Sequence, residues 1–192
     1  SDEDLKLLAS LPQFCPQFHL SMQSGCDETL KRMNRHYDST TYREIVAKIR
    51  EYFPNPSITT DIMVGFPGET EEEFQQSLAF SKEIAFAKAH IFAYSVRQGT
   101  RAAKMDNQIT NAVKEQRSHI LSAAMEVCRQ DFMRQQIGLT EEVLFETDIV
   151  DGAYVGYTKN YTPVWVKSDT PLCGQLHMVR ITGMNQQYCI GE

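Results

Sequence analysis

The segment 57–74 constrains the fold of this chain more than any other. It begins with an apolar, β-branched run and then enters the turn Gly65-Phe66-Pro67-Gly68. Thr70 and Glu73 follow at the spacing of a capping box, in which two side chains bond the backbone at the start of a helix. The segment therefore predicts a β-strand, a tight turn, and an acidic helix that ends near residue 86.

The two faces of this strand differ, because successive side chains in a strand point to opposite sides. One side carries Ile58, Ile62 and Val64, and the other carries Thr59, Asp61 and Met63. A buried strand of an ordinary α/β domain is apolar on both faces. The carboxylate of Asp61 therefore indicates a polar interior, as in a barrel that carries its chemistry in the lumen.

Strand-like and helix-like segments alternate up to about residue 137. Helices are predicted at 2–10, 27–34, 41–53, 70–86 and after Thr110, and strands at 17–23, 57–65 and 88–95. A second capping box, formed by Thr41 and Glu44, places the start of the third helix. Repeated strand–helix units imply parallel strands with right-handed crossovers. Three strands are too few to close a barrel, so we expect an α/β fold that contains part of a (βα) barrel from a larger protein.

The pattern changes after Gly138, where short β-type runs alternate with Gly, Asn, Asp or Pro. These runs lie at 143–149, 153–158, 162–166, 176–181 and 187–190. Five strands in so short a segment predict a small, closed or nearly closed all-β barrel of the OB type. The predicted domains are therefore 1–138 and 139–192.

Composition excludes several classes of protein. Of the 192 residues, 42% are hydrophobic and 23% charged, as in ordinary globular proteins. The net charge of −6 argues against a protein that simply coats nucleic acid. We find no signal peptide and no apolar run long enough to span a bilayer, so we expect a cytoplasmic protein without a membrane partner. The five cysteines are scattered, with no CxxC or CxxxCxxC spacing, and predict no metal site in this chain.

The three predicted strands place polar side chains on one shared face. The first strand contributes His19, Ser21 and Gln23, the second Thr59 and Asp61, and the third His90, Phe92 and Tyr94. The strand ends at 23–25, 65–68 and 94–97 would face a ligand. Each feature has an ordinary alternative: His19 as a hydrogen-bonded interior residue, Asp61 as the partner of an Arg or His, and 65–68 as a simple turn. Jointly, the three successive strand ends favour a binding site.

Three motifs together resemble one protein family. They are His19-Leu-Ser-Met-Gln-Ser-Gly25 with the segment 29–35 after it, the segment 60–70, and the segment 94–103. They are similar to the latter part of the radical S-adenosylmethionine barrel of the tRNA and ribosomal-protein methylthiotransferases. The segment after Gly138 resembles the TRAM domain, an OB-like RNA-binding module. The resemblance covers essentially the whole chain.

The resemblance implies a radical chemistry. In this family a [4Fe–4S] cluster reduces S-adenosylmethionine, C2 of an adenosine is activated, and a second cluster takes part in sulfur insertion. The cluster-binding cysteines of the family lie upstream of this sequence, and none of the present cysteines matches one. The chain would then be a C-terminal fragment that is inactive alone, with no catalytic or metal-binding residue of its own.

Within the family, residues 23–27 and 156–161 most resemble the branch that acts on threonylcarbamoyladenosine, next to the tRNA anticodon. The isopentenyladenosine branch is the next most similar, and the ribosomal-protein branch is less so. The implied partners are the tRNA anticodon stem-loop and S-adenosylmethionine. The exact nucleoside and the sulfur donor stay open.

Position in the family's motifs assigns candidate contacts to S-adenosylmethionine. Gln23 and Arg97 are expected to make polar contacts, and Asp61 to lie near the ribose or the substrate. Gly65 and Tyr94 are expected to flank the adenine, through backbone and ring.

In the TRAM-like part, four residues are candidate RNA contacts by charge and stacking: Lys159, Asn160, Tyr161 and Trp165. Aromatic residues on short strands are equally typical of a barrel core. The segment 139–192 also carries more acidic than basic residues, so it is poorly suited to bind RNA unaided.

Two rival interpretations remain at this level. The chain is either a complete, non-catalytic RNA-binding module on an α/β scaffold, or part of another radical S-adenosylmethionine enzyme, since Gly-Phe-Pro-Gly-Glu turns occur in several. A partial barrel also leaves an open sheet edge, which predicts a homo-oligomer through edge pairing.

Overall fold

The structure is a computed structural model that describes all residues from 1 to 192. The chain forms two compact units that interleave in sequence. One unit comprises 1–18, 49–57 and 130–192, and the other comprises 19–48 and 58–129. The division into domains at residue 138 stays a prediction. No helix combines the length and apolar character needed to cross a bilayer.

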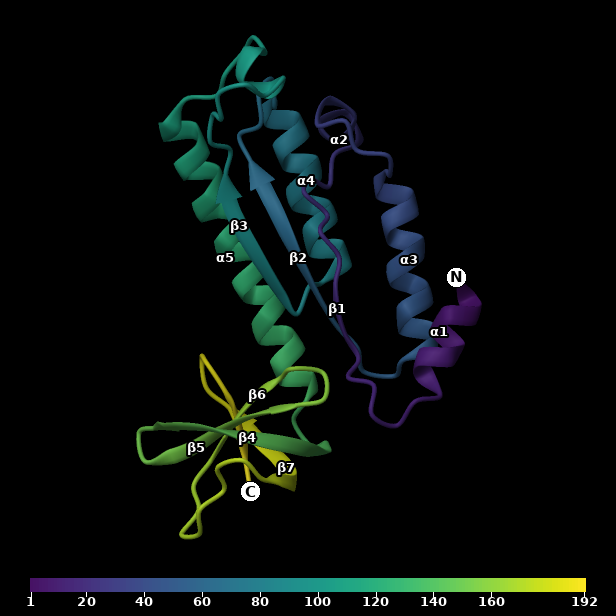
Figure 1. The fold of residues 1–192 in the computed structure, drawn as a ribbon. Coiled ribbons are helices and arrows are strands. Elements are labelled where there is room, and N and C mark those ends of the chain that lie inside the picture. The colour runs from purple at the N-terminus through teal and green to yellow at the C-terminus, as the bar shows by residue number, and fades with distance from the viewer. The chain divides into compact units, whose positions relative to one another are not determined.

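The first part of the chain contains a three-stranded sheet in the order β1-β2-β3 (Figure 1). Its strands are β1 (Gln17–His19), β2 (Ser57–Val64) and β3 (Lys88–Ala93). The helices are α1 (Asp2–Ala9), α2 (Asp27–Arg32), α3 (Ser39–Tyr52), α4 (Glu71–Ile84) and α5 (Asn111–Gln135), with a 3₁₀ turn at Ala102–Lys104. Since β2 and β3 are parallel, the strand–helix alternation and the predicted fold class are confirmed.

Strand β2 has the two faces that its sequence predicts. Ile58, Ile62 and Val64 are buried, and Thr59, Asp61 and Met63 are half-buried. Helix α4 begins at the predicted capping box: Thr70 accepts from the amide of Glu73, whose carboxylate accepts from the amide of Thr70. The structure of this segment therefore follows from its local sequence.

Strand β1 is shorter than the predicted strand at 17–23. The regular strand ends at His19, and pairing with β2 resumes at Gln23, which is bridged to Ile62. Gln23 has a φ of 64°, a left-handed backbone conformation that interrupts an extended run. The hydroxyl of Tyr37 bonds the carbonyls of Ser21 and Met22 in this interruption. The sequence pattern gave no sign of that contact.

The predicted capping box at Thr41 and Glu44 is wrong. Helix α3 starts earlier, at Ser39, and Asp38 accepts a hydrogen bond of 2.7 Å from the amide of Thr41. Asp is a strong N-cap residue. The same backbone bond lowers the pKa of the Asp38 carboxyl.

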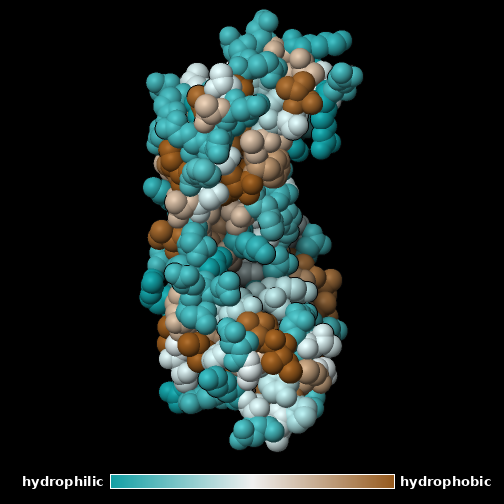
Figure 2. All heavy atoms as spheres, turned by 90° about the vertical axis from the view of Figure 1, so that its left-hand side faces the viewer, coloured by the Kyte–Doolittle hydropathy of each residue, from teal (hydrophilic) through white to brown (hydrophobic).

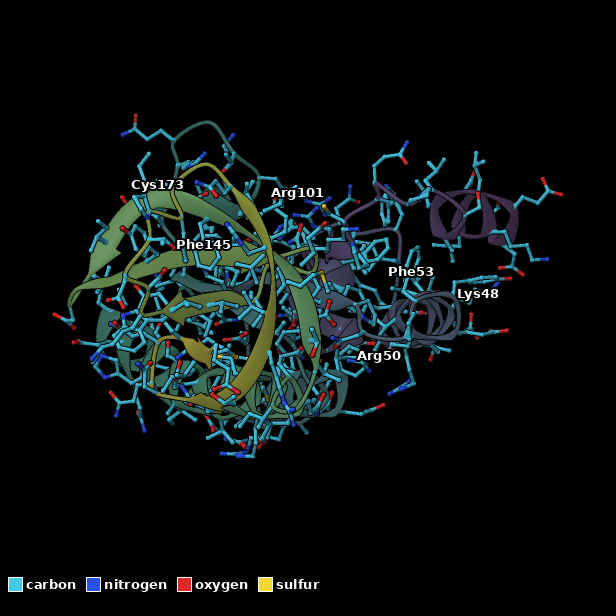
Figure 3. The ribbon with its side chains drawn as sticks, turned by 90° about the horizontal axis from the view of Figure 1, so that it is seen from below. Lys48, Arg50, Phe53, Arg101, Phe145 and Cys173 are labelled. Carbon is cyan, nitrogen blue, oxygen red and sulfur yellow. The ribbon has the colours of Figure 1, made fainter.

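The last part of the chain, from residue 140 to 191, forms a closed barrel in the order β4-β5-β6-β8-β7. Its strands are β4 (Thr140–Val150), β5 (Ala153–Thr158), β6 (Pro163–Val166), β7 (Leu176–Met184) and β8 (Cys189–Gly191). Phe145 lies inside the barrel and is almost fully buried, whereas Cys173 is exposed at its rim (Figure 3). The five predicted strands are all present, with ends shifted by a few residues.

The core of the barrel is closely packed. Val143, Val164, Ile181 and Cys189 have no exposed surface in its core. An added Cβ on Gly191 would lie 2.2 Å from Cγ1 of Val179, so only glycine fits there. The same unit includes a ring cluster in which Phe53 lies 5.4 Å from Phe14 and 5.1 Å from Phe18, centroid to centroid.

Candidate functional site

The polar face of the parallel sheet carries a connected group of side chains. His19 Nδ1 lies 3.0 Å from Oγ1 of Thr59, and His19 Nε2 lies 3.3 Å from Oδ2 of Asp61. The hydroxyl of Ser21 donates to the same carboxylate oxygen at 3.2 Å. The predicted convergence of β1 and β2 side chains on one face is thus present in the structure.

This group is open to solvent rather than part of a packed core. The side chains of His19 and Asp61 are 42% and 31% exposed. On the neighbouring strand, His90 is paired in register with Asp61 and is also exposed. Asp61 therefore has a histidine partner, which was the ordinary alternative to a role in ligand binding. Its side chain nevertheless remains partly exposed.

The turn after β2 is held in an unusual conformation. Gly65 has a φ of +71° and Gly68 a φ of +76°, both in the region that favours glycine. The amide of Gly65 donates a hydrogen bond of 2.7 Å to Oε2 of Glu69, and the amide of Gly68 donates to the carbonyl of Asn107. The turn is more than a simple connection, because the side chain of Glu69, which follows it, accepts a hydrogen bond from the first residue of the turn.

A buried ion pair fixes that carboxylate. Arg117 of α5 donates through Nη1 to Oε2 of Glu69 at 2.7 Å and to the Glu69 carbonyl at 3.0 Å. The two side chains are only 6% and 2% exposed. Burial raises the pKa of Glu69, although the Gly65 amide and Arg117 oppose this shift. Removing one partner of a pair this deeply buried is strongly destabilising, because it leaves the other charge buried and uncompensated.

A second basic residue of α5 lies beside the pair. The stem of Lys114 packs on Gly65, and its ammonium lies 5.3 Å from the ring centroid of Tyr94. Lys114 and Arg117 are both buried, and their spacing of three places them on one helix face. Sequence analysis missed both residues, and the only available signal was two basic residues on the otherwise apolar side of a predicted helix.

The predicted cofactor contacts fall into different settings. Gln23 is buried and takes part in the sheet ladder, since its amide donates to the carbonyl of Asp61 and its own carbonyl accepts from Met63. Arg97 is exposed in the loop after β3.

Tyr94 is buried, and two neighbours already contact its ring. Phe66 packs edge-on at 5.4 Å between centroids, and the Lys114 ammonium lies over the ring. The Tyr94 hydroxyl is buried without a hydrogen-bond partner. An orphaned phenol of this kind is uncommon and calls for an explanation.

The predicted RNA contacts on the barrel differ in exposure and in their partners within the protein. Tyr161 is 62% exposed, with its ring 6.2 Å from that of Tyr157. The ammonium of Lys159 bonds the carbonyl of Pro12 and pairs with Glu142 at 3.3 Å. Trp165 is half-buried, and its indole N–H donates to the carbonyl of Val150.

Asn160 has a structural setting. It is buried, its side-chain oxygen accepts from the hydroxyls of Thr158 and Thr162, and its amide donates to the carbonyl of Asn55 at 3.0 Å. Since both ends of the amide are occupied within the protein, its geometry favours a structural role over contact with RNA.

The chain has no cluster of His, Cys, Asp and Glu able to hold a metal ion, and its five cysteines are free. The residues present therefore do not fit an iron–sulfur cluster. The solvent-open polar face and the glycine turn after β2 are the candidate binding features of this part of the chain.

Comparison with known proteins identifies the family of this chain. Residues 1–81 match the profile of the Radical SAM superfamily. The chain is 37% identical over its whole length to the tRNA-2-methylthio-N(6)-dimethylallyladenosine synthase of Clostridium botulinum. It is 44% identical, over 77% of its length, to the protein of that name from Corynebacterium jeikeium. It is 34% identical, over 97% of its length, to the threonylcarbamoyladenosine tRNA methylthiotransferase of Thermotoga maritima.

The class defined by this sheet and by the Radical SAM match is that of radical S-adenosylmethionine proteins. Within that class, the chain belongs to the family of tRNA methylthiotransferases. It spans 43% of the length of the Clostridium and Thermotoga relatives and 29% of the Corynebacterium relative.

Proposed function

We propose that this chain is the C-terminal part of a tRNA methylthiotransferase that adds a methylthio group to C2 of a modified adenosine beside the anticodon. The observation that carries the proposal is similarity to two kinds of tRNA methylthiotransferase, at 37% identity over the whole chain and 34% over 97% of it. The polar strand face and the glycine turn agree with it. The chain is expected to be inactive alone, because its residues do not fit an iron–sulfur cluster and it spans less than half of the length of these relatives.

The S-adenosylmethionine site is proposed at the ends of the parallel strands. Asp61 is a partly exposed polar group there, Gly65 follows the last residue of β2, and Gln23 lies at the end of the first strand. Arg97 would supply a positive charge from the exposed loop. Bound with its clusters, S-adenosylmethionine would supply the chemistry that activates C2, while these residues hold and orient it.

The proposed RNA surface is on the outside of the barrel, which we assign as a TRAM-type module. Tyr161 and Tyr157 offer rings for base stacking, and Lys159 offers a positive charge. Leu144 is exposed and lies in register with both Tyr157 and Leu176, so the stacking surface continues as an apolar strip. Groups of hydrophobic side chains are visible among hydrophilic ones on the face shown in Figure 2.

Mass spectrometry of tRNA nucleosides, in a strain that lacks the parent gene, tests the proposed reaction. Loss of methylthio-threonylcarbamoyladenosine would place the protein in the branch that residues 23–27 and 156–161 resemble. Loss of the methylthio-isopentenyl nucleoside would place it in the branch whose relatives reach 37–44% identity. If both nucleosides persist, the methylthiotransferase proposal fails and the rival of a non-catalytic RNA-binding module gains support.

The cofactor contacts are tested in the full-length protein. Gln23→Ala and Arg97→Ala should each weaken S-adenosylmethionine binding, measured by calorimetry, whereas Lys82→Ala on the exposed side of α4 should not. Unchanged affinity in both variants would remove Gln23 and Arg97 from the site. A cytoplasmic location and oligomerisation through the open sheet edge remain part of the proposal.

A further inference from the structure

A pocket of about 540 Å³ lies between the end of β3 and the start of α5. Its walls come from two short segments, Ala93–Val96 and the first turns of α5, where Asn111, Lys114 and Glu115 line it. None of these α5 residues belongs to the motifs that place S-adenosylmethionine in the proposed function. The pocket is large enough for a nucleoside-sized group.

Lys114 gives the pocket its chemical character. The side chain is 7% exposed, and its ammonium lies over the ring of Tyr94 without forming an ion pair with a carboxylate. A buried ammonium is costly unless it is paired and hydrogen-bonded. The packing of its stem on Gly65 holds the side chain along the wall of the pocket.

Other groups on the wall are also suited to an anion. The hydroxyl of Tyr94 is buried and has no partner. Asn111 is the first residue of α5, where free backbone amides and the helix dipole favour negative charge. Glu115 is the one acidic residue of the lining, and it is exposed.

We propose that this pocket is a subsite for an anionic oxygen group, a carboxylate or a phosphate, with Lys114 as its counter-ion. The inference goes beyond the proposed function, because it rests on the unpaired charge and holds whichever reaction the parent protein performs. The choice of probes rests on the proposed function, which supplies two sources of such a group: an amino-acid carboxylate on a nucleoside, and a phosphodiester of RNA.

The test measures binding to the full-length protein, without turnover. The carboxylate probe is S-adenosylhomocysteine, with 5′-methylthioadenosine as the matched ligand that lacks the amino-acid group. The phosphate probe is an anticodon stem-loop RNA. Lys114→Met removes the charge but keeps most of the stem against Gly65, and Lys82→Met makes the same change on the exposed surface of α4.

Lys114→Met should weaken one probe about ten-fold, as expected for a lost charge-assisted hydrogen bond, and Lys82→Met should weaken neither. A loss confined to S-adenosylhomocysteine, with 5′-methylthioadenosine unaffected, identifies a carboxylate. A loss confined to the RNA identifies a phosphodiester. Unchanged affinity for both probes in folded Lys114→Met overturns the proposal.

Two exposed positions keep the test decisive if Lys114→Met does not fold. Glu115→Gln removes a repelling charge and should tighten the same probe about two- to three-fold, and Asn111→Asp adds one and should weaken it by a similar factor. If neither substitution changes the affinity for either probe, the subsite is wrong. Because nothing here depends on methylthiolation, a negative nucleoside assay would leave the result standing.

Discussion

The stem of Lys114 in α5 lies directly against the backbone of Gly65 at the end of β2. A Cβ at Gly65 would lie 2.3 Å from Cγ of Lys114, far inside van der Waals contact. The two residues are distant in sequence, and their contact joins the start of α5 to the glycine turn. The shape of this turn is therefore set by the packing of a helix as well as by its own glycines.

Gly65→Ala should be strongly destabilising. A methyl group there costs about 1–2 kcal/mol for the left-handed backbone and about 1–3 kcal/mol more for overpacking against Lys114. Gly99 has a φ of +83° and nothing within 4 Å, so Gly99→Ala should cost the backbone part alone. Urea unfolding of both variants measures the difference, and equal losses would show that Lys114 yields without cost.

Arg117→Met should cost about 3–5 kcal/mol at neutral pH, because it leaves the buried Glu69 carboxylate without its partner. Arg134 pairs with Asp131 on the exposed surface, so Arg134→Met should cost at most about 1 kcal/mol. Chemical denaturation followed by circular dichroism compares the two. A similar small loss in both would mean that the burial of the Arg117 pair contributes nothing.

The defect of Arg117→Met should shrink in acid. Burial raises the pKa of Glu69 in the folded protein, and loss of Arg117 removes an opposing charge. A group whose folded pKa is above its unfolded value binds the proton more tightly when folded, so stability rises as pH falls through the folded pKa. The difference between variant and wild type should therefore be smaller at pH 5 than at pH 8, and a constant difference would contradict this mechanism.

Glu73 should show the opposite pH dependence. Burial acts to raise its pKa, but hydrogen bonds from Arg32, the Thr70 amide and Thr29 outweigh burial and lower it. Its contribution is present above the unfolded pKa of about 4.3 and is lost as pH falls through the lower folded value. Glu73→Gln should thus be about 1–2 kcal/mol less stable than wild type at pH 7.

The control for Glu73 is the exposed pair of Glu28 and Lys31. Glu28→Gln should change stability by less than about 0.5 kcal/mol at either pH. Thermal unfolding at pH 7 and pH 3 should show the gap between Glu73→Gln and wild type closing in acid. A gap that widens would mean that the carboxylate is not held ionised by Arg32.

Asn160 and Tyr161 are neighbours with different expected roles. Asn160→Ala removes buried hydrogen bonds to Thr158, Thr162 and Asn55, and should destabilise the protein by about 1–3 kcal/mol. Tyr161→Ala should leave stability nearly unchanged and weaken RNA binding several-fold through lost stacking. Calorimetric melting and filter binding of an anticodon stem-loop measure the two effects. Loss of RNA binding in a fully stable Asn160→Ala variant would restore Asn160 as a contact.

Local sequence determined the elements of this protein. The β-branched run, the glycine turn and the Thr70–Glu73 box each act over a few residues, and their strand, turn and helix all form as predicted. The alternation along β2 likewise fixed which side of the strand carries Asp61. The wrong start predicted for α3 also has a local cause, since Asp38 is a stronger N-cap than Thr41 and lies three residues before it.

Tertiary structure decided what surrounds these elements. Arg117 reaches Glu69, Lys114 covers Gly65, and Asn160 bonds Asn55, although helix and strand periodicity reports only which side of an element is apolar. Long-range packing thus places Arg117 in a buried ion pair with Glu69 and Lys114 in the wall of the pocket. The sequence by itself determined the strands, their polar face and the family motifs. Only the folded chain set which charges are buried and which of them lack a partner, because desolvation depends on neighbours far along the chain.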